Sequence, residues 1–281
     1  MAESQALELN LATPRRWLTP ALRQRIESLA LGTATIALLL VLWELLPHFF
    51  PVQQGTRLFF TVPSRIFATL WQMFATGAIW APLGVSASAF AIGLALAIAV
   101  GLPLGILLGR SATLNSMFDP FVTALNATPR LVFLPLLMLW LGIGLWSKVA
   151  VVFAGALFPL LINTHEGVRN ADKLLINVVR SFGATGWDVA RLVVIPNALP
   201  FIVVGLRLAI GRAILGVVVA EFFGAQDGLG VVMVRAASSF NVDVVFADLI
   251  VFAGLSLMMT GLVKLIENRM SRWRPQRLEN E

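Results

Sequence analysis

Six apolar runs dominate this sequence, and each is long enough, or nearly long enough, to cross a lipid bilayer as a helix. A bilayer core of about 30 Å takes about 20 apolar residues of helix, and a helix satisfies its own backbone hydrogen bonds in lipid. The pattern therefore predicts an all-α membrane protein with six transmembrane helices. The runs occupy approximately residues 29–46, 85–108, 131–145, 149–163, 201–223 and 244–266.

Composition supports a membrane protein and removes several classes of chemistry. Hydrophobic residues make up 58% of the chain and charged residues 13%, against about 45–50% and about 25% in soluble domains. The chain has no Cys and no Tyr, which excludes disulfides, thiolate metal sites and catalysis by either residue. With His48 and His165 as the two histidines, a multi-histidine metal centre is not expected. No cleavable signal peptide is expected either, because the apolar run after the polar N-terminus lacks a small-residue cleavage site.

Lysine and arginine are divided unequally between the two predicted sides of the membrane. When the segments between the runs are assigned alternately, one side receives fifteen basic residues and the other receives four. Cytoplasmic segments carry such an excess, so the net charge of +6 indicates orientation rather than nucleic-acid binding. We predict a cytoplasmic N-terminal segment 1–28, a single transmembrane domain 29–269 with a cytoplasmic loop at about 171–198, and a cytoplasmic tail 270–281.

The cytoplasmic loop has the pattern of two short amphipathic helices. Apolar residues recur at helical spacing over 173–182, Gly183 then allows a backbone turn, and a second apolar stripe begins at Trp187. Pro196 and Pro200 are expected to stop the second helix before the fifth span. Two interpretations remain open for this polar interruption: a docking surface for a soluble partner, or a plain amphipathic connector on the membrane surface.

The residues of this loop also resemble a known signature. Gly183, nine residues, and then Val193-Val194-Ile195-Pro196 resemble the cytoplasmic "EAA" motif of permease subunits of ATP-binding-cassette importers. The chain departs from that motif at its start, where Asn177-Val178-Val179 replaces Glu-Ala-Ala, so the ion pair that the glutamate would make is in doubt. The resemblance extends over residues 62–269 and is strongest to the subfamily that imports nitrate, sulfonates and taurine. The matching segments are 62–64, 127–144, 158–170, 180–213 and 218–230.

The resemblance implies a bacterial inner-membrane complex of two permeases, two cytoplasmic ATPases and an external solute-binding protein. The second permease is expected to be another copy of the same chain, and membrane lipid surrounds the pair. ATP and Mg²⁺ belong to the partner ATPase, because this chain has no G-x4-G-K-[ST] loop and is not itself expected to be an enzyme. The resemblance places a coupling segment against the ATPase, and its residues are Arg180, Ser181, Phe182, Gly183, Ala184, Trp187, Asp188, Arg191 and Pro196.

Polar residues at membrane depth are costly and face a cavity or a partner, so they are candidates for the translocation pathway or its gating. Arg207 and Arg212 are five residues apart and point roughly 140° apart on a helix, so they do not both line one narrow pathway. We select Arg207 as the arginine for an anion pathway and regard Glu221 as structural or gating. The candidates are Asn126, Thr128, Asn163, Arg207 and Glu221.

Gly101, Gly105 and Gly109 repeat every four residues in the second run, and Pro103 is expected to kink that helix. Small residues at this spacing let helix backbones approach closely, which predicts packing within the subunit or across a dimer. Residues 63–74 are predicted to form a helix in the outer interface, either as a packed cap over the span ends or as a contact for an external partner.

Two other functions compete with an importer subunit. An ion-coupled secondary carrier would show inverted repeats and acidic residues at mid-membrane, whereas no internal repeat is visible and the acidic residues lie near span ends. An intramembrane enzyme would need paired carboxylates, a Ser–His arrangement or metal ligands within the bilayer. No predicted span contains two acidic residues, and the predicted topology places His48 and His165 on opposite sides.

Overall fold

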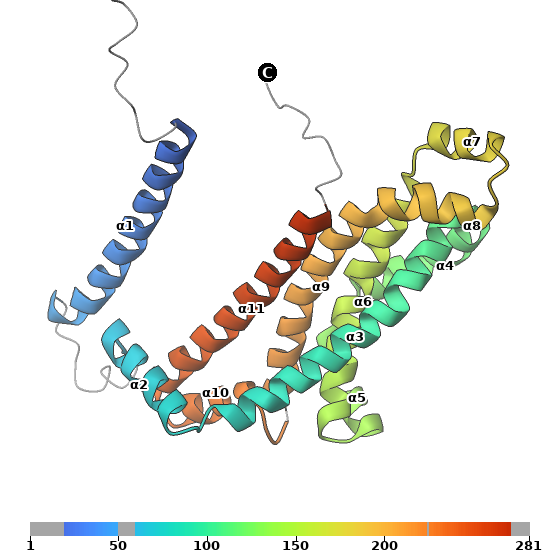
Figure 1. Ribbon diagram of the computed structural model, residues 1–281. Coiled ribbons are helices and arrows are strands. Elements are labelled where there is room, and N and C mark those ends of the chain that lie inside the picture. Colours follow the sequence, from blue (N-terminus) through green and yellow to red (C-terminus); the bar gives the residue numbers. More distant parts are fainter. Residues whose placement is uncertain (1–19, 50–59, 224, 271–281) are drawn as a thin grey trace, which may run out of the picture. The chain divides into compact units, whose positions relative to one another are not determined.

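The computed structural model describes residues 20–49, 60–223 and 225–270 (Figure 1). The chain divides into two units, residues 1–64 and residues 65–281. Most of the predicted N-terminal segment 1–28 and nearly all of the predicted tail 270–281 lie outside the described residues. Residues 20–28 of that segment are helical and form the first turns of α1.

The first unit contains α1, Pro20–Phe49, which agrees with the first predicted span. Its part Ile26–Pro47 is apolar and long enough to cross a membrane. Near its end, the Glu44 carboxylate accepts hydrogen bonds from the Ser64 backbone N–H at 3.0 Å and from Ser64 Oγ at 2.7 Å. Ser64 belongs to the first turn of α2, Pro63–Ala75, where backbone N–H groups lack intrahelical partners and favour negative charge.

The described part of the second unit consists of helices joined by short connections (Figure 1). Four of its helices are long and apolar enough to cross a membrane, and α2 forms the predicted helix over residues 63–74. The elements after α2 are α3 (Trp80–Arg110), α4 (Ala112–Ala127), η3 (Arg130–Phe133), α5 (Leu134–Leu141), α6 (Leu145–Arg169), α7 (Lys173–Ser181), α8 (Gly186–Val189), η4 (Ala190–Val194), α9 (Ile195–Phe222), α10 (Leu229–Ser238) and α11 (Val242–Met270).

The core of this unit lies where α3, α6 and α9 pack together. Small residues dominate it, because lipid provides no hydrophobic drive and helices associate by close packing instead. Gly93 of α3 meets Val152 of α6, and Gly109 meets Val168, so α3 and α6 run parallel. α9 runs antiparallel to α6, since its later residues meet the earlier part of α6. The buried core residues are Ala97, Val152, Ala156, Leu160, Ala209, Ala213 and Val217.

The glycine repeat of α3 faces α6 within the same chain. A Cβ at Gly105 would lie 2.6 Å from Thr164 Cβ and 2.8 Å from the Leu161 carbonyl oxygen. A Cβ at Gly109 would come as close to α6, at 2.6 Å from Val168 Cβ, whereas Gly101 has slightly more room. Of the two arrangements left open by the sequence, the structure places these glycines in packing within the subunit.

The predicted third span, 131–145, is wrong in its bounds. Residues in that range form η3 and α5, and the eight residues of α5 extend about 12 Å, far less than a bilayer core. Because α3 and α6 are parallel, the chain between Arg110 and Leu145 must return across the full bundle. It does so as a broken crossing in which α4, η3 and α5 follow one another. Arg130 is one of the fifteen basic residues assigned to the cytoplasmic side from the sequence, but it lies within the crossing. The remaining basic residues still favour the same side.

The two ends of the bundle differ in what they carry. Figure 1 shows α7 and α8 at one end of α3, α6 and α9, and α5 and α10 at the opposite end. We refer to these as the loop end and the far end. At the far end, Arg65 of α2 forms an ion pair with Asp243 at the start of α11, with Nη2 2.6 Å from Oδ2.

Candidate functional site

The loop end presents a compact element made of α7 and α8. Asp172 caps α7 by accepting a hydrogen bond from the Leu174 backbone N–H at 2.8 Å. Gly183 then adopts φ +81°, in the left-handed region that favours glycine, and turns the chain toward α8. Thr185 and Asp188 form a reciprocal capping box: Thr185 N–H donates to Asp188 Oδ2 at 2.8 Å, and Asp188 N–H donates to Thr185 Oγ1 at 3.3 Å.

One face of this element packs down onto the bundle. Ile176, Val179 and Ala184 lie against a buried cluster formed by the ends of α6 and α9 and by α8. The buried residues of the cluster are Val168, Ala171, Val189, Val194 and Ala198. In addition, Arg110 at the end of α3 donates a hydrogen bond to the Gly186 carbonyl at 3.3 Å. The element is therefore held on the core rather than suspended from it.

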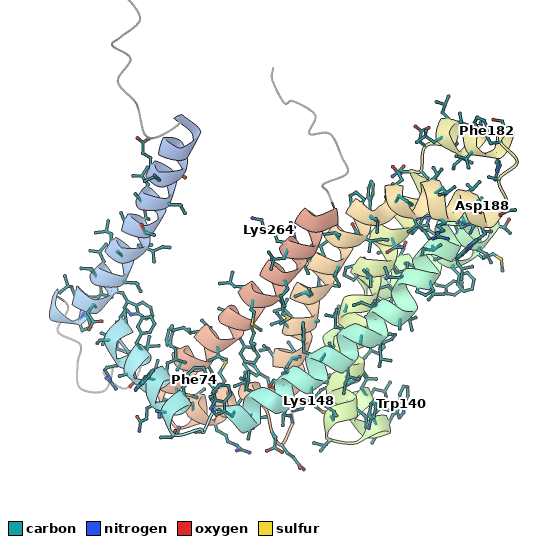
Figure 2. All side chains as sticks on the ribbon, viewed as in Figure 1. Phe74, Trp140, Lys148, Phe182, Asp188 and Lys264 are labelled. Atoms are coloured by element: carbon teal, nitrogen blue, oxygen red, sulfur yellow. The ribbon has the colours of Figure 1, made fainter. Side chains whose placement is uncertain are left out.

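The opposite face of the element exposes large apolar side chains. Phe182 is 86% exposed, Leu174 is 71% exposed and Trp187 is 69% exposed. Figure 2 shows Phe182 and Asp188 at the loop end, with Lys148 at the far end. Arg180, Ser181 and Gly183 are exposed beside them, as are Arg191 and Pro196 along the helix that follows. Ala184 is the predicted coupling residue whose side chain turns mainly inward.

The predicted proline stop before the fifth span is wrong, because the helix continues through both prolines. Residues Gly186–Phe222 form one helical segment of 37 residues. Within it, η4 is a π-helical turn in which the Ile195 N–H donates to the Ala190 carbonyl. Pro196 follows directly after this turn, where the wider π-helical spacing already interrupts the α-helical hydrogen-bond pattern, and Pro200 lies inside α9.

A second candidate region is a cavity of about 450 Å³ between the broken crossing and the core. Asn126, Thr128 and Arg212 meet there, although they are far apart in the sequence. Of the two arginines of α9, the structure places Arg212 in this cavity, whereas Arg207 does not line it. The lining residues are Asn126, Ala127, Thr128, Pro129, Val151, Gly155, Arg212, Leu215, Gly216 and Val219.

Asn163 and Glu221 take part in packing contacts away from that cavity. Asn163 Nδ2 donates to the Pro159 carbonyl one turn back in α6 at 2.7 Å, and its Cβ stands 2.8 Å from where a Cβ of Gly205 would be. Glu221 is 2% exposed and lies at the far end. The structure therefore brings together two of the five predicted pathway residues, Asn126 and Thr128, with Arg212, which was not among the predicted residues.

Glu221 is the centre of a buried polar cluster that joins α3, α6, α9 and α10. Its oxygens accept hydrogen bonds from Ser86 Oγ at 2.8 and 2.9 Å, from Lys148 Nζ at 3.1 Å and from the Gly230 N–H at 2.8 Å. Ser86 Oγ accepts in turn from the Leu229 N–H at 2.9 Å. Lys148 also donates to the Asp227 carbonyl. The first turn of α10 is thus anchored on a carboxylate, which its N-terminal dipole favours.

Two residues of the far end escaped the sequence reasoning. Lys148 is one of the four basic residues on the less basic side, and the sequence places it in the short connection between two predicted spans, but it is 3% exposed inside the bundle. Asp248 of α11 is fully buried, and neither of its carboxylate oxygens has a hydrogen-bond partner among the described residues. The available signal was the position of each charge inside an otherwise apolar helical run, since lipid alone would not tolerate it.

Comparison with known proteins gives consistent matches. The family described as "Binding-protein-dependent transport system inner membrane component" matches residues 101–272. The aliphatic sulfonates transport permease SsuC of Bacillus subtilis (strain 168) is 34% identical over 212 residues, covering 75% of this chain and 77% of that protein. The taurine transport system permease TauC of Escherichia coli (strain K12) is 29% identical over 263 residues, covering 92% of this chain and 93% of that protein.

A solved structure supports the fold. A chain of the MetNI methionine ABC transporter in an inward-facing conformation superposes with a TM-score of 0.59, covering 69% of this chain and 97% of that chain at 21% identity. The fold is that of a multi-pass helical membrane protein, and the resemblance to importer permeases predicted from the motifs is confirmed. The chain belongs to the family of binding-protein-dependent transport system inner membrane components.

Proposed function

We propose that this chain is the membrane-spanning permease subunit of an ATP-driven importer for a small anion, of the sulfonate, taurine or nitrate kind. A solute-binding protein delivers the anion, and a separate ATPase couples to the permease through the loop at residues 171–198. Membership of the family and the sulfonate and taurine permeases among its relatives support this proposal.

The observation that carries the coupling role is the exposed apolar face on α7 and α8. Phe182 and Trp187 are 86% and 69% exposed at the loop end, where the core does not cover them. Exposed apolar patches rimmed by polar residues mark protein interaction sites. The rim here is polar, with Arg180, Asp188 and Arg191 beside the two aromatic residues.

The helical continuity between α8 and α9 supplies a mechanical link. Trp187 lies in the first turn of the same 37-residue helix that carries Arg212 and Glu221. A displacement of the docked α7–α8 element by closure of the ATPase pair would therefore tilt α9 as a rigid lever. Because Gly155 and Gly216 let α6 and α9 approach closely, the tilt would reach the cavity beside Arg212. Such movements of packed helices are a general means of switching between conformations.

The complete transporter would contain two copies of this chain, two ATPase subunits that hold ATP and Mg²⁺, and one solute-binding protein outside the bacterial plasma membrane. Both termini and the α7–α8 element would be cytoplasmic. The far end, with α2, α5 and α10, would face the solute-binding protein. In this arrangement the chain itself hydrolyses nothing.

The proposal is tested by purifying the tagged full chain from native membranes in mild detergent and identifying retained proteins by mass spectrometry. We expect a roughly equimolar ATPase, recognised by its G-x4-G-K-[ST] loop. Phe182→Ser should lower the retained ATPase by at least about tenfold, as loss of one central aromatic anchor does at interfaces. Trp146→Ser, which changes another exposed aromatic residue at the far end, should leave the retained ATPase unchanged.

Two results would contradict the proposal. A wild-type chain that purifies without any ATPase would favour an ion-coupled secondary carrier. Equal ATPase retention by the Phe182→Ser and wild-type chains would remove the α7–α8 face from the interface while leaving the subunit assignment in place.

A further inference from the structure

Arg212 is the charged residue of the cavity beside the broken crossing. The other nine lining residues are neutral, and no carboxylate is among them. Within residues 20–49, 60–223 and 225–270, the Arg212 guanidinium has no hydrogen bond or ion pair. A guanidinium carries five N–H donors and keeps its charge, so it needs water or an anion beside it.

Arg212 lies near the middle of the predicted membrane span, where lipid provides neither water nor an anion. It lies ten residues before the far end of α9 at Phe222, and it packs beside Gly155, ten residues after the start of α6. At 1.5 Å per residue both distances are about 15 Å, which is the middle of a bilayer core of about 30 Å. A charge at that depth marks a functional site by default, with a named partner to be sought.

The local packing holds the arginine at the cavity wall. A Cβ at Gly155 would lie 3.1 Å from the Arg212 carbonyl oxygen, so the absence of a side chain lets the α9 backbone press against α6. One turn further along α9, a Cβ at Gly216 would lie 3.2 Å from Val152 Cα. Both glycines line the cavity, and this close contact directs long side chains of α9 away from α6 and into the open space.

The wall opposite α9 comes from the end of α4, where the crossing breaks. Thr128 ends that helix, and its hydroxyl donates to the Ala124 carbonyl at 2.7 Å. Irregular backbone at membrane depth is tolerated where it lines a water-filled cavity, because lipid cannot satisfy its polar groups. Asn126, in the last turn of α4, also lines the cavity. The break therefore faces a cavity whose one charged lining residue is Arg212.

We propose that Arg212 forms a transit subsite for a monovalent oxyanion, a sulfonate or carboxylate, in the cavity lined by Asn126 and Thr128. This subsite rests on the proposed importer function and assigns its anion selectivity to a residue of this chain. The guanidinium can donate two parallel hydrogen bonds to two oxygens of a sulfonate or a carboxylate. The ammonium of a lysine cannot make this paired contact as well. A volume of about 450 Å³ accommodates a small organic anion together with water.

The absence of cysteine from the chain gives a direct test that requires neither the natural solute nor transport. Thr128→Cys places one thiol at the cavity, and its modification is timed with 2-sulfonatoethyl methanethiosulfonate and with the cationic 2-(trimethylammonium)ethyl analogue. The ratio of the two rates reports the local charge and cancels effects on thiol reactivity. We expect the anionic reagent to be favoured and Arg212→Gln to lower the ratio about tenfold, from the attraction of one nearby charge.

Matched variants and conditions complete the test. Arg207→Gln in the same Thr128→Cys background should leave the ratio unchanged, because Arg207 does not line the cavity. Millimolar ethanesulfonate should slow modification of the chain that retains Arg212, whereas choline should not. Size-exclusion profiles of all variants check folding. Protection by ethanesulfonate is measured on the chain that retains Arg212, so this part of the test remains valid even if Arg212→Gln does not fold.

Three results would overturn the subsite. They are an unreactive thiol in the Thr128→Cys chain, a ratio that Arg212→Gln does not change, and a ratio that Arg207→Gln lowers equally. A preference present in detergent but abolished in phosphatidylglycerol nanodiscs would also overturn it, because the guanidinium would then hold a lipid phosphate. Loss of the subsite and loss of the importer function are separable, because ATPase retention is measured on the chain without these substitutions.

Discussion

Lys148 and Glu221 form a buried ion pair, with Lys148 Nζ 3.1 Å from Glu221 Oε1 and the two side chains 3% and 0% exposed. The pair joins the first turn of α6 to the last turn of α9. Further donors from Ser86 and the Gly230 N–H satisfy the carboxylate, so the charge is fully coordinated inside the bundle. The contact fixes the far end of α9, the helix that we propose acts as a lever between the ATPase and the cavity.

Removing one partner of this ion pair should strongly destabilise the folded chain. Lys148→Met leaves the Glu221 carboxylate buried without its counter-charge, and such changes cost about 3–5 kcal/mol. We expect a large loss of monodisperse protein and a lower melting temperature in detergent. The double variant Lys148→Met/Glu221→Gln should recover part of that loss, since neither charge remains. A single variant as stable as wild type would contradict the structural role given to this pair.

Close packing between α3 and α6 should make Gly105 intolerant of even one methyl group. In Gly105→Ala the new Cβ would lie 2.8 Å from the Leu161 carbonyl oxygen, and helix backbone cannot yield as a side-chain tip can. Overpacking of this kind costs about 1–3 kcal/mol. The matched control is Gly254→Ala in α11, where a Cβ meets nothing within 4 Å.

Thermal unfolding followed by size exclusion measures both glycine variants. We expect Gly105→Ala to have a lower melting temperature than the wild-type chain. Gly254→Ala should be neutral or slightly stabilising, because alanine in a helix is favoured over glycine by roughly 0.5–1 kcal/mol. Equal effects of the two substitutions would show that α3 and α6 can separate without cost.

The left-handed backbone at Gly183 sets the direction of α8 relative to α7. With φ at +81° and no atom within 4 Å of a would-be Cβ, substitution there acts through backbone strain and not through a clash. Gly183→Val should cost about 1–2 kcal/mol, whereas Gly183→Asn should cost little because asparagine visits this region. Faster amide hydrogen exchange across α7 in the valine variant, with near-normal exchange in the asparagine variant, is the expected result.

The same position tests coupling. If α7 and α8 dock on the ATPase, Gly183→Asp should insert and fold normally but disconnect ATP hydrolysis from uptake in the reconstituted transporter. Uptake at the wild-type rate would remove Gly183 from the docking contact.

Asp248 should be a source of instability in the isolated chain. Both of its carboxylate oxygens are buried without a hydrogen-bond partner among the described residues, and burial of an unpaired polar group costs about 1–3 kcal/mol. Asp248→Asn removes the charge at nearly constant shape and should raise the melting temperature. Asp243→Asn, which loses the ion pair with Arg65, should not. A lower melting temperature for Asp248→Asn would mean that the carboxylate has a stabilising partner.

Hydropathy alone located the long apolar helices of the described chain within a few residues at one or both ends, because a bilayer demands long uninterrupted apolar helix. It failed at the third crossing. There α4 is less apolar because it contains Asn115, Asp119 and Asn126. The predicted span was therefore placed over the more apolar residues after Leu131, too far toward the C-terminus. A crossing broken into α4, η3 and α5 has no run of the required length, so only the parallel packing of α3 on α6 shows it.

The sequence by itself determined the helical membrane fold, the glycine turn at 183 and the family, because these depend on local composition and spacing. Only the tertiary structure decided which arginine of α9 faces a cavity, and that Lys148 lies inside the bundle against Glu221. Helical periodicity gives the angle between Arg207 and Arg212 but not the direction in which either points. That direction is set by where α6 and the broken crossing pack, and such contacts join residues far apart in the chain.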